Sequence, residues 1–519
     1  MVTLRVYRFD PDSGEEGHFD TYDVPYEEGM RVLDGLHYIH DHLDGTLAFR
    51  WVCRAGQCGS CGIRINGKAG LACQEPLPGE GETTLEPLML FPVVKDLVVD
   101  FGEGYRRLYE SEPYLSREEP MADPPALLPG DVAPLKDFRS CIECWCCVSA
   151  CPVANRVWDD YYGPIVMRKL CELDIDSRDL AERVKIALNE GLYHCTTCRN
   201  CWAVCPEHIE IPEKAVEKLR AHAVRDGLGP LPGHNTLVQS IKNYRNPWVM
   251  PRQRRARWAK GLELSDRGAF MFFAGCSPSL LLGDRLPANV VRVLDRLGMR
   301  PAYLGKEELC CGSPLLKVGD EVAYRELASE NIALMKERGV KTLVTTCAGC
   351  HKSWATDYRA FFGDFGIEVK HVSEILWDAF QSGAFTLRDL PENHVTVTYH
   401  DPCHLGRGTG VYDAPRNLIR AVPGMRLVEP ERIRENSHCC GSGGGVKTAK
   451  PEVALEVGKE RIRQFEELEP AYIISCCPWC EQHLDDSIAY ARASLGATRD
   501  LIEIIERTME VASHERGNC

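Results

Sequence analysis

Long hydrophobic runs are missing from this sequence of 519 residues. The richest apolar stretch, LMLFPVVKDLVVDF at 88–101, is too short to cross a bilayer and contains charged residues. The chain opens MVTLRVYRFDPDSGEE, with acidic residues where a secretory signal would have its apolar core. We therefore expect no transmembrane segment and a cytoplasmic location.

An excess of positive charge is also missing. Lysine and arginine together number 61 against 76 aspartate and glutamate residues, which gives a formal net charge of −15. A nucleic-acid partner is therefore not expected. A dinucleotide-binding fingerprint is missing too, because neither GRGTG (406–410) nor GSGGG (441–445) matches G-x-G-x-x-G after a strand. Any flavin is therefore expected on another chain.

Cysteine, by contrast, is abundant, with 26 residues. Disulfide bonds are disfavoured in the cytosol, so this number indicates metal binding. Scattered buried cysteines are the alternative, but they would not produce repeated spacings. The cysteines fall into three groups, each with its own spacing.

The first group has the spacing C-x4-C-x2-C…C and consists of Cys53, Cys58, Cys61 and Cys73. This spacing is typical of plant-type [2Fe–2S] sites. Glycines between the ligands tolerate the unusual backbone angles that aim amide N–H groups at sulfur. Alternating patterns on either side of the loop predict strands. Zinc is the alternative, and the four-residue first gap makes it a poor one.

The second group is a run that occurs twice, SCIECWCCVSACP at 140–152 and HCTTCRNCWAVCP at 194–206. Each run reads C-x2-C-x2-C-x3-C-P, in which the first three cysteines hold one cubane and the fourth ligates the other. The predicted ligand sets of the two [4Fe–4S] clusters are Cys141, Cys144, Cys147 and Cys205 for one, and Cys195, Cys198, Cys201 and Cys151 for the other. The crossing is expected to pin two helical hairpins together.

The third group is an internal repeat in residues 268–485. Each copy has five cysteines on an apolar strand, a CCG loop and a C-x2-C pair, and equivalent cysteines are offset by 127 to 130 residues. The first set is Cys276, Cys310, Cys311, Cys347 and Cys350, and the second is Cys403, Cys439, Cys440, Cys477 and Cys480. Open α/β sheets place ligand sites at such strand ends. Five thiolates exceed the four of a zinc site and favour an open cluster with a bridging thiolate.

Several cysteines, histidines and glycine-rich loops lie outside these ligand sets. The cysteines interpreted as free thiols are Cys146, Cys171, Cys476 and Cys519. Three histidines adjoin a ligand cysteine, namely His351, His404 and His438, and a structural or supporting role is favoured over catalysis. GSGGG directly follows CCG and is interpreted as backbone folded against a cluster rather than a phosphate cradle. GRGTG is interpreted as a loop.

Residues 1–235 resemble the iron–sulfur subunit of succinate dehydrogenases and fumarate reductases, because the cysteine runs at 53–73, 141–152 and 195–206 match that family. Those subunits usually lack a cysteine at the position of Cys198 and hold a [3Fe–4S] cluster. Here Cys198 is present, so a full [4Fe–4S] cluster is implied, as in the small subunit of heterodisulfide reductase. We expect a lower potential for this centre than for its three-iron counterpart.

Residues 268–485 resemble the catalytic subunit of heterodisulfide reductase, which has two cysteine-rich CCG domains. The resemblance implies a noncubane [4Fe–4S] cluster on each five-cysteine set and makes those ten cysteines the candidate catalytic residues. It also implies that the pair of clusters forms or cleaves the disulfide between coenzyme M and coenzyme B. Arg407 and Lys447, near the CCG loops, are candidates to bind the coenzyme sulfonate and phosphate.

In this order, the two parts resemble the B-subunit family of the thiol:fumarate reductases of methanogenic archaea. The resemblance implies an oxidoreductase in which electrons pass from thiols through the noncubane clusters, the two cubanes and the [2Fe–2S] centre. They would then reach a partner resembling the flavoprotein (A) subunit of fumarate reductase or succinate dehydrogenase, which carries FAD and reduces fumarate to succinate. A quinone-linked dehydrogenase subunit and a non-enzymatic electron carrier or scaffold are the alternatives.

The expected fold class is multidomain, since a chain of this length suggests three or four domains. The expected parts are a β-grasp plant-type ferredoxin domain at 1–105, an α-helical bacterial-type ferredoxin domain at 106–235, a linker at 236–267, and two repeated α/β CCG domains at 268–390 and 391–519.

Overall fold

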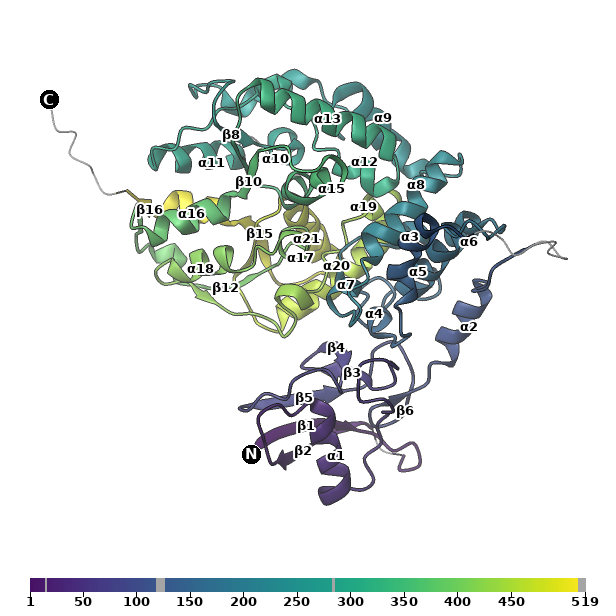
Figure 1. Ribbon diagram of the computed structural model, residues 1–519. Coiled ribbons are helices and arrows are strands. Elements are labelled where there is room, and N and C mark those ends of the chain that lie inside the picture. Colours follow the sequence, from purple (N-terminus) through teal and green to yellow (C-terminus); the bar gives the residue numbers. More distant parts are fainter. Residues whose placement is uncertain (15, 118–126, 282–284, 512–519) are drawn as a thin grey trace. The chain divides into compact units, whose positions relative to one another are not determined.

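The computed structural model describes residues 1–14, 16–117, 127–281 and 285–511. Cys519, interpreted from the sequence as a free thiol, lies outside this part of the chain. The chain divides into two compact units, Met1–Ala223 and Val224–Cys519, and each is described by itself (Figure 1).

The first unit begins with a five-stranded sheet in the order β2-β1-β5-β3-β4. Its strands are β1 (Val2–Arg8), β2 (His18–Val24), β3 (Gly62–Ile65), β4 (Lys68–Leu71) and β5 (Glu82–Glu86). β1 and β5 pair in parallel, and the other neighbours pair antiparallel. Every second residue of β1 is buried, which leaves one face for the core. Helix α1 (Val32–Tyr38) covers that face, where a Cβ on Gly35 would lie 2.7 Å from Leu4 Cδ1.

A short ribbon of β6 (Val93–Lys95) and β7 (Val98–Val99) completes this part of the unit. Asp96, at its turn, is buried and accepts three hydrogen bonds. The donors are Arg8 Nε at 3.1 Å and the backbone N–H groups of Phe9 at 2.9 Å and Ala48 at 2.8 Å. The buried carboxylate therefore joins the ribbon to the sheet.

The rest of the first unit is helical. Its elements are α2 (Gly102–Glu110), α3 (Pro129–Arg139), α4 (Cys146–Ser149), α5 (Gly163–Asp174), α6 (Arg183–Asn189), η2 (Leu192–His194), α7 (Asn200–Ala203), η3 (Ile211–Val216) and most of α8 (Glu217–Arg225), which continues past the end of this unit at Ala223. The single turns α4 and α7 lie inside the two cysteine runs, so each run ends in a short helix that Pro152 or Pro206 follows.

The second unit contains two parallel sheets with the same strand order. The first sheet consists of β10 (Glu368–His371), β9 (Thr342–Thr345) and β8 (Phe270–Phe273), with a bridge from Met271 to Ala302 at its edge. The second consists of β15 (Gly496–Asp500), β14 (Tyr472–Ser475), β12 (Thr396–Tyr399) and β13 (Arg426–Leu427). The repeat of cysteine spacing is therefore also a repeat of topology.

Helices surround both sheets (Figure 1). They are η4 (Pro232–His234), α9 (Asn235–Tyr244), η5 (Arg252–Ala259), α10 (Cys276–Leu280), α11 (Arg285–Arg296), η6 (Gly305–Glu307), α12 (Ser313–Val318), α13 (Glu321–Glu337), α14 (Ala348–Lys352), η7 (Ser353–Asp357), α15 (Tyr358–Phe362), α16 (Val372–Gln381), η8 (Pro391–Asn393), α17 (Gly406–Thr409), α18 (Asp413–Ala421), η9 (Arg434–Asn436), α19 (Val446–Ala449), α20 (Pro451–Glu466), α21 (Pro478–Ala491) and α22 (Leu501–Thr508). A short antiparallel pair, β11 (Thr386–Leu387) and β16 (Met509–Glu510), lies beside them.

The two repeats share a hydrophobic core. Phe272 and Val344 of the first sheet belong to the same buried cluster as Tyr399 and Ile474 of the second. Strands that helices cover on both faces have nearly continuous apolar sequences, and these strands are therefore recognisable in the sequence.

The segment 236–267, expected as a linker, contains α9 and η5 and is packed. Val238 and Ile241 of α9 lie in one hydrophobic core, and Trp258 of η5 lies in another. The three-residue spacing of Val238 and Ile241 places both side chains on one helical face. This segment therefore contributes to the folded second unit.

Across the described ranges, no helix combines the length and the apolar character needed to span a membrane.

Candidate iron–sulfur centres

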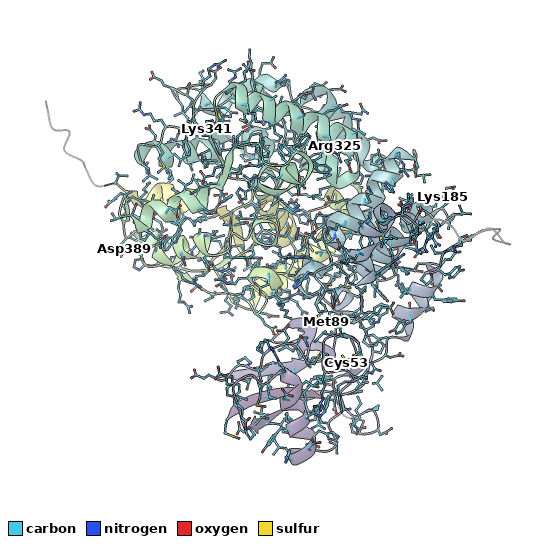
Figure 2. The ribbon with its side chains drawn as sticks, in the orientation of Figure 1. Cys53, Met89, Lys185, Arg325, Lys341 and Asp389 are labelled. Carbon is cyan, nitrogen blue, oxygen red and sulfur yellow. The ribbon has the colours of Figure 1, made fainter. Side chains whose placement is uncertain are left out.

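The N-terminal cysteine loop aims amide N–H groups at sulfur; its first cysteine, Cys53, is labelled in Figure 2. The N–H groups of Ala55 and Gln57 donate to Cys53 Sγ at 3.3 and 3.4 Å. Positive φ angles at Arg54 (57°) and Gly56 (71°) turn the backbone into this arrangement. Amide donors directed at a thiolate suit a cluster, because they stabilise its negative charge.

The other cysteines of this loop differ in exposure. Cys58 is exposed and shares a hydrogen bond with Ser60 Oγ at 3.1 Å, which lowers the pKa of Cys58 to about 6. Cys61 is buried, and this burial raises the pKa of its thiol to about 12. Gln74 Nε2 donates to Cys73 Sγ at 3.7 Å. One side of the site therefore faces solvent, and the other lies inside the domain.

The two cubane runs share one backbone conformation. φ is +52° at both Glu143 and Thr197, and it is +62° at Trp145 and +66° at Arg199. These are equivalent positions of the two runs, and positive φ is uncommon outside glycine. In the second run this turn lets the Thr197 N–H donate to Cys195 Sγ at 3.4 Å. The cysteine spacing therefore specifies the loop conformation in both copies.

The runs exchange their fourth cysteines. A small cavity of about 20 Å³ is lined by three cysteines of the first run and one of the second, namely Cys141, Cys144, Cys147 and Cys205. Cys151 of the first run lies near cysteines of the second, namely Cys195, Cys198 and Cys201. The structure thus brings each of the two expected four-cysteine sets together.

The N-terminal cysteine loop lies directly against the first cubane run. A Cβ on Gly59 would lie 2.6 Å from the carbonyl oxygen of Ile142, and one on Gly62 would lie 2.9 Å from that of Cys144. Glycine is required at both positions because the two backbones touch. Two candidate centres of the first unit are therefore near neighbours.

Three of the cysteines interpreted as free thiols are described, namely Cys146, Cys171 and Cys476, and all three are buried. The Cys171 thiol donates to the backbone carbonyl of Lys214 at 3.4 Å. Burial raises the pKa of Cys171 and of Cys476, which favours the neutral thiol. In the described residues, no cysteine forms a disulfide.

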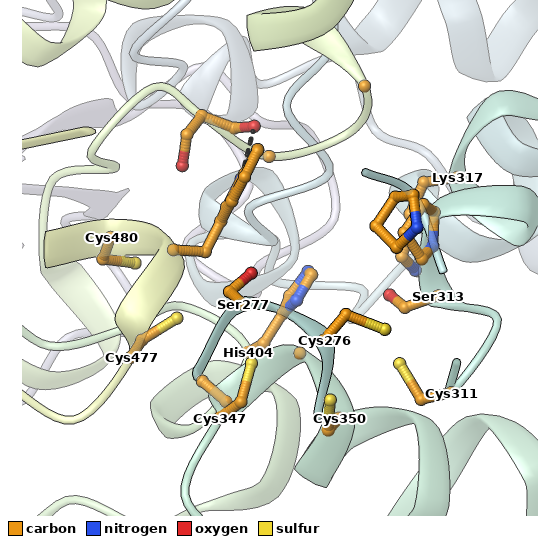
Figure 3. Close-up of a pocket in the computed structure, with 18 of the residues that line it drawn as sticks. Cys276, Ser277, Cys311, Ser313, Lys317, Cys347, Cys350, His404, Cys477 and Cys480 are labelled. Carbon is orange, nitrogen blue, oxygen red and sulfur yellow. Dashed lines mark hydrogen bonds between the residues drawn. The ribbon is translucent and has the colours of Figure 1, made fainter. Parts of the chain in front are cut away.

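Nine of the ten repeat cysteines line one cavity in the second unit. Its volume is about 150 Å³, roughly ten times what one ordered water requires. The tenth cysteine, Cys439, is buried but does not line it. Figure 3 shows Cys477 and Cys480 on one side of the cavity, Cys276 and Cys311 on the other, and His404 between them.

The two five-cysteine sets meet at Cys347 and Cys477, which lie close enough for each thiol to shift the pKa of the other. Each residue stands just after a strand, β9 for Cys347 and β14 for Cys477, and these strands are equivalent in the two repeats. The contact therefore joins equivalent positions, and the two sets form adjacent sites on one cavity.

The glycine of each CCG loop directs an amide at a cysteine. Gly312 N–H donates to Cys310 Sγ at 3.4 Å, and Gly441 N–H donates to Cys439 Sγ at 3.3 Å. Both glycines have positive φ, 77° and 101°. A Cβ on Gly441 would lie 2.2 Å from the carbonyl oxygen of Ala454, so no side chain fits there.

The buried thiols of the second set share protons. The sulfur atoms of Cys440 and Cys480 lie 3.6 Å apart, and Cys440 also bonds Ser442 Oγ at 3.1 Å. Hydrogen bonds with Cys439 and Cys480 hold the pKa of Cys440 well below its ordinary value, whereas the bond with Cys440 raises the pKa of Cys480. A metal ion replaces such shared protons, because a coordinating thiol is deprotonated.

The three histidines that adjoin ligand cysteines have different surroundings. His404 lines the cavity. His438 Nδ1 lies 2.8 Å from the backbone oxygen of Cys439. His351 Nδ1 lies 3.2 Å from Thr345 Oγ1, and burial lowers the pKa of His351 to about 4. The structure thus places His404 where it can meet a ligand and His351 in a structural position.

The sequence reasoning missed His400. One of its ring nitrogens and the sulfur atoms of Cys440 and Cys480 all lie within 4.8 Å of one another. Burial lowers the pKa of His400 to about 3, so the ring is neutral. The signal was available in HDPC (400–403), where the histidine directly follows the strand that delivers Cys403.

The two cations proposed from the sequence lie outside the cavity lining. Arg407 is buried and donates to the backbone oxygens of Glu435 at 3.1 Å and Ser437 at 2.7 Å. Lys447 pairs with Asp486 at 2.8 Å and lies 5.1 Å from the centre of the Trp479 ring.

Lys317, which the sequence reasoning missed, lines the cavity and is 3% exposed. The internal repeat could have indicated Lys317, because Lys317 and Lys447 follow the two CCG loops at a separation of 130 residues.

Three protein-family models match the chain. The 2Fe-2S iron-sulfur cluster binding domain matches residues 3–105, and the 4Fe-4S dicluster domain matches residues 137–209. The cysteine-rich CCG domain matches twice, at residues 270–353 and 397–485. The chain is therefore a multidomain iron–sulfur protein.

The B subunit of fumarate reductase (CoM/CoB) from Methanothermobacter marburgensis is 37% identical over 494 residues, which cover 94% of this chain and 95% of the relative. The chain belongs to this B-subunit family. That relative is named as a subunit of an oxidoreductase, and this chain is likewise an oxidoreductase subunit. The family resemblance predicted from the cysteine motifs is confirmed.

Two other relatives each match 72% of this chain. The D subunit of dihydromethanophenazine:CoB–CoM heterodisulfide reductase from Methanosarcina mazei is 32% identical, and the match covers 95% of that relative. EtfAB:quinone oxidoreductase of Syntrophomonas wolfei is 29% identical, and the match covers 59% of that relative.

The ligand sets predict the iron content and the effect of one cysteine. Anaerobically purified protein should contain roughly 18 iron atoms per chain, with matching sulfide. Cys198→Ser should convert one cubane into a three-iron centre with a higher potential, because a thiolate ligand is lost. Elemental analysis and EPR spectroscopy of the oxidised protein measure both effects.

Cys171→Ser is the matched control, because Cys171 is also buried but bonds only a backbone oxygen among the contacts described above. It should leave the iron content unchanged. Zinc in place of iron, or no new three-iron signal in Cys198→Ser, would contradict the assignment.

Proposed function

We propose that this chain oxidises the thiols of coenzyme M and coenzyme B to their heterodisulfide and passes the electrons to a flavoprotein that reduces fumarate to succinate. The observation that carries the proposal is the cavity that nine of the ten cysteines of the two five-cysteine sets line together. Two thiols lose two electrons and two protons as their sulfur atoms join, and fumarate takes up the same number of each. The name of the relative from Methanothermobacter marburgensis supports this chemistry.

The cavity residues fit two noncubane [4Fe–4S] clusters, one on each five-cysteine set. When bound, such clusters supply one-electron redox chemistry. The chain itself supplies closely spaced sulfur atoms, amide donors from Gly312 and Gly441, and apolar walls that exclude water. His404 places an imidazole in the cavity, where a ring nitrogen can accept a proton from a thiol.

The remaining assignments follow the order of the chain. A β-grasp domain (1–105) holds one [2Fe–2S] cluster, an α-helical domain (106–235) holds two [4Fe–4S] clusters, and the α/β CCG domains (268–390 and 391–519) form the thiol site. The partner subunit carries FAD. Covalent linkage keeps neighbouring centres close without relying on concentration.

Lys317 is the cavity cation that fits the anionic end of a substrate. It and Lys352 both act on the buried carboxylate of Asp357, to which Lys352 donates at 2.5 Å. Lys317 therefore places a buried ammonium group at the cavity, where it can donate a charged hydrogen bond to an anionic substrate group. Trp248 and Trp479, with ring centroids 5.2 Å apart, form an apolar wall of the same cavity.

The second candidate function is a quinone-linked dehydrogenase subunit, which the partial match to EtfAB:quinone oxidoreductase favours. The largely apolar cavity lining would also suit a quinone ring. Both five-cysteine sets are complete, which favours thiol substrates over a quinone. Two complete sets provide two adjacent sites, one for the sulfur atom of each thiol.

Turnover with the flavoprotein partner distinguishes the two functions. The anaerobic complex should reduce fumarate with coenzyme M and coenzyme B thiols together, and much more slowly with either thiol alone, because both sulfur atoms are needed. Measuring succinate and heterodisulfide in equal amounts checks the balance. Quinone reduction without thiol-dependent fumarate reduction would support the dehydrogenase instead.

Lys317→Met tests the anion contact in that complex. A hydrogen bond to a charged group contributes about 1.5–3 kcal/mol, so KM for the anionic thiol should rise about 10- to 100-fold with a smaller change in kcat. Lys447→Met is the repeat-equivalent control and should leave KM near the wild-type value. Equal effects of the two substitutions would contradict the assignment to Lys317.

A further inference from the structure

We propose that Arg255 tunes the reduction potential of the first-repeat iron–sulfur centre by donating an N–H hydrogen bond to the sulfur of Cys276. The inference rests on the proposed role of Cys276 as a cluster ligand. It goes beyond the proposed function because it names a positioning residue that acts on the centre through that ligand. Arg255 lies in η5, in the segment that the sequence suggested was a linker.

The Arg255 guanidinium is buried between a sulfur atom and a carboxylate. One terminal nitrogen donates to Cys276 Sγ at 3.1 Å, and the other donates to Glu308 Oε1 at 2.6 Å. The side chains of Arg255 and Glu308 are each 1% exposed. A guanidinium this deeply buried needs charged partners, and the thiolate and the carboxylate provide them.

Glu308 holds the loop that delivers Cys276. Its Oε2 accepts the Ala274 N–H at 2.7 Å, and its Oε1 accepts the Gly275 N–H at 3.1 Å. The three hydrogen bonds described for this carboxyl group all come from N–H donors, an arrangement that suits an ionised carboxylate. The residue also stands two positions before Cys310, in the second ligand loop of the same set.

The backbone oxygen of Arg245 joins the guanidinium to the other ligand loop. It accepts from Arg255 at 3.3 Å and from the Cys310 N–H at 3.0 Å. Arg255 therefore donates to two groups, Glu308 Oε1 and the Arg245 backbone oxygen, and each of these also accepts a hydrogen bond from a ligand loop. These contacts fix the position of the guanidinium relative to Cys276 from both sides.

The electrical effect of this arrangement has a defined sign. Hydrogen bonds to ligand sulfur and nearby positive charge stabilise the reduced, more negative cluster and raise its potential. The carboxylate of Glu308 is nearby and opposes that effect. Removing the donor should therefore lower the potential, and neutralising the carboxylate should raise it.

Potential shifts of opposite sign in the two variants would distinguish tuning of the potential by Arg255 from a purely structural role as a clamp. Loss of a clamp would loosen the site in both variants and would not move the potential in opposite directions. The test compares Arg255→Gln with Glu308→Gln in the full-length, anaerobically purified protein. Potentiometric titration followed by EPR spectroscopy gives the midpoint of each centre, and the first-repeat signal is the one that Cys276→Ser alters.

The expected result is a negative shift of the first-repeat midpoint in Arg255→Gln, a positive shift in Glu308→Gln, and unchanged midpoints of the [2Fe–2S] and cubane centres. Arg255→Lys, which keeps the charge but not the planar fork, should shift the midpoint less than Arg255→Gln. It also provides the measurement if Arg255→Gln does not fold. Shifts of the same sign, or no shift in any of these variants, would overturn the proposal.

Arg416→Gln is the matched control. Arg416 forms a buried ion pair with Asp401 through bonds of 2.7 and 2.6 Å, and this pair lies in the second repeat. Its loss should reduce stability in a similar way but leave the first-repeat midpoint unchanged; a shift of that midpoint equal to the one in Arg255→Gln would overturn the proposal. A wild-type protein without iron in the first repeat would instead refute the proposed function, so the two failures are distinguishable.

Discussion

The burial of many thiols at short range is the constraint on which the rest of the structure depends. Thiolates that lie a few ångströms apart in a low-dielectric interior repel one another, and each carries a desolvation cost. Without a metal, the chain can hold them only by sharing protons and by directing donors at sulfur. The amides of the cysteine loops, the positive φ angles beside them and the Arg255 guanidinium all serve this need.

The same constraint explains the architecture of the second unit. In a parallel sheet, the carboxyl ends of the strands lie along the same end of the sheet. A cysteine that follows such a strand therefore faces the space beyond that end, where ligands bind. Cys347 and Cys477 follow equivalent strands of two sheets that share one core. Packing the two sheets together therefore brings the carboxyl ends of these strands, and with them Cys347 and Cys477, close together.

Features that depend on local spacing could be predicted from the sequence, and features that depend on long-range packing could not. The distance between neighbouring ligands is limited by the size of the cluster, so the cysteine sets are visible as motifs, and the repeat is visible as an offset. Arg255 is different, because it reaches Cys276 across 21 positions and Glu308 across 53. The packing of α9 and η5 likewise depends on tertiary contacts that no motif encodes. His400 and Lys317 are different, because HDPC and the 130-residue offset between Lys317 and Lys447 mark them in the sequence.

The 3.6 Å separation of the Cys440 and Cys480 sulfur atoms has a consequence for how the protein matures. A disulfide needs about 2.05 Å between sulfur atoms, so a small side-chain movement would join this pair in air. A disulfide there would occupy two of the five cysteines of the proposed second-repeat site until a reductant cleaved it. We therefore expect assembly of the proposed cluster at this site to need reducing conditions.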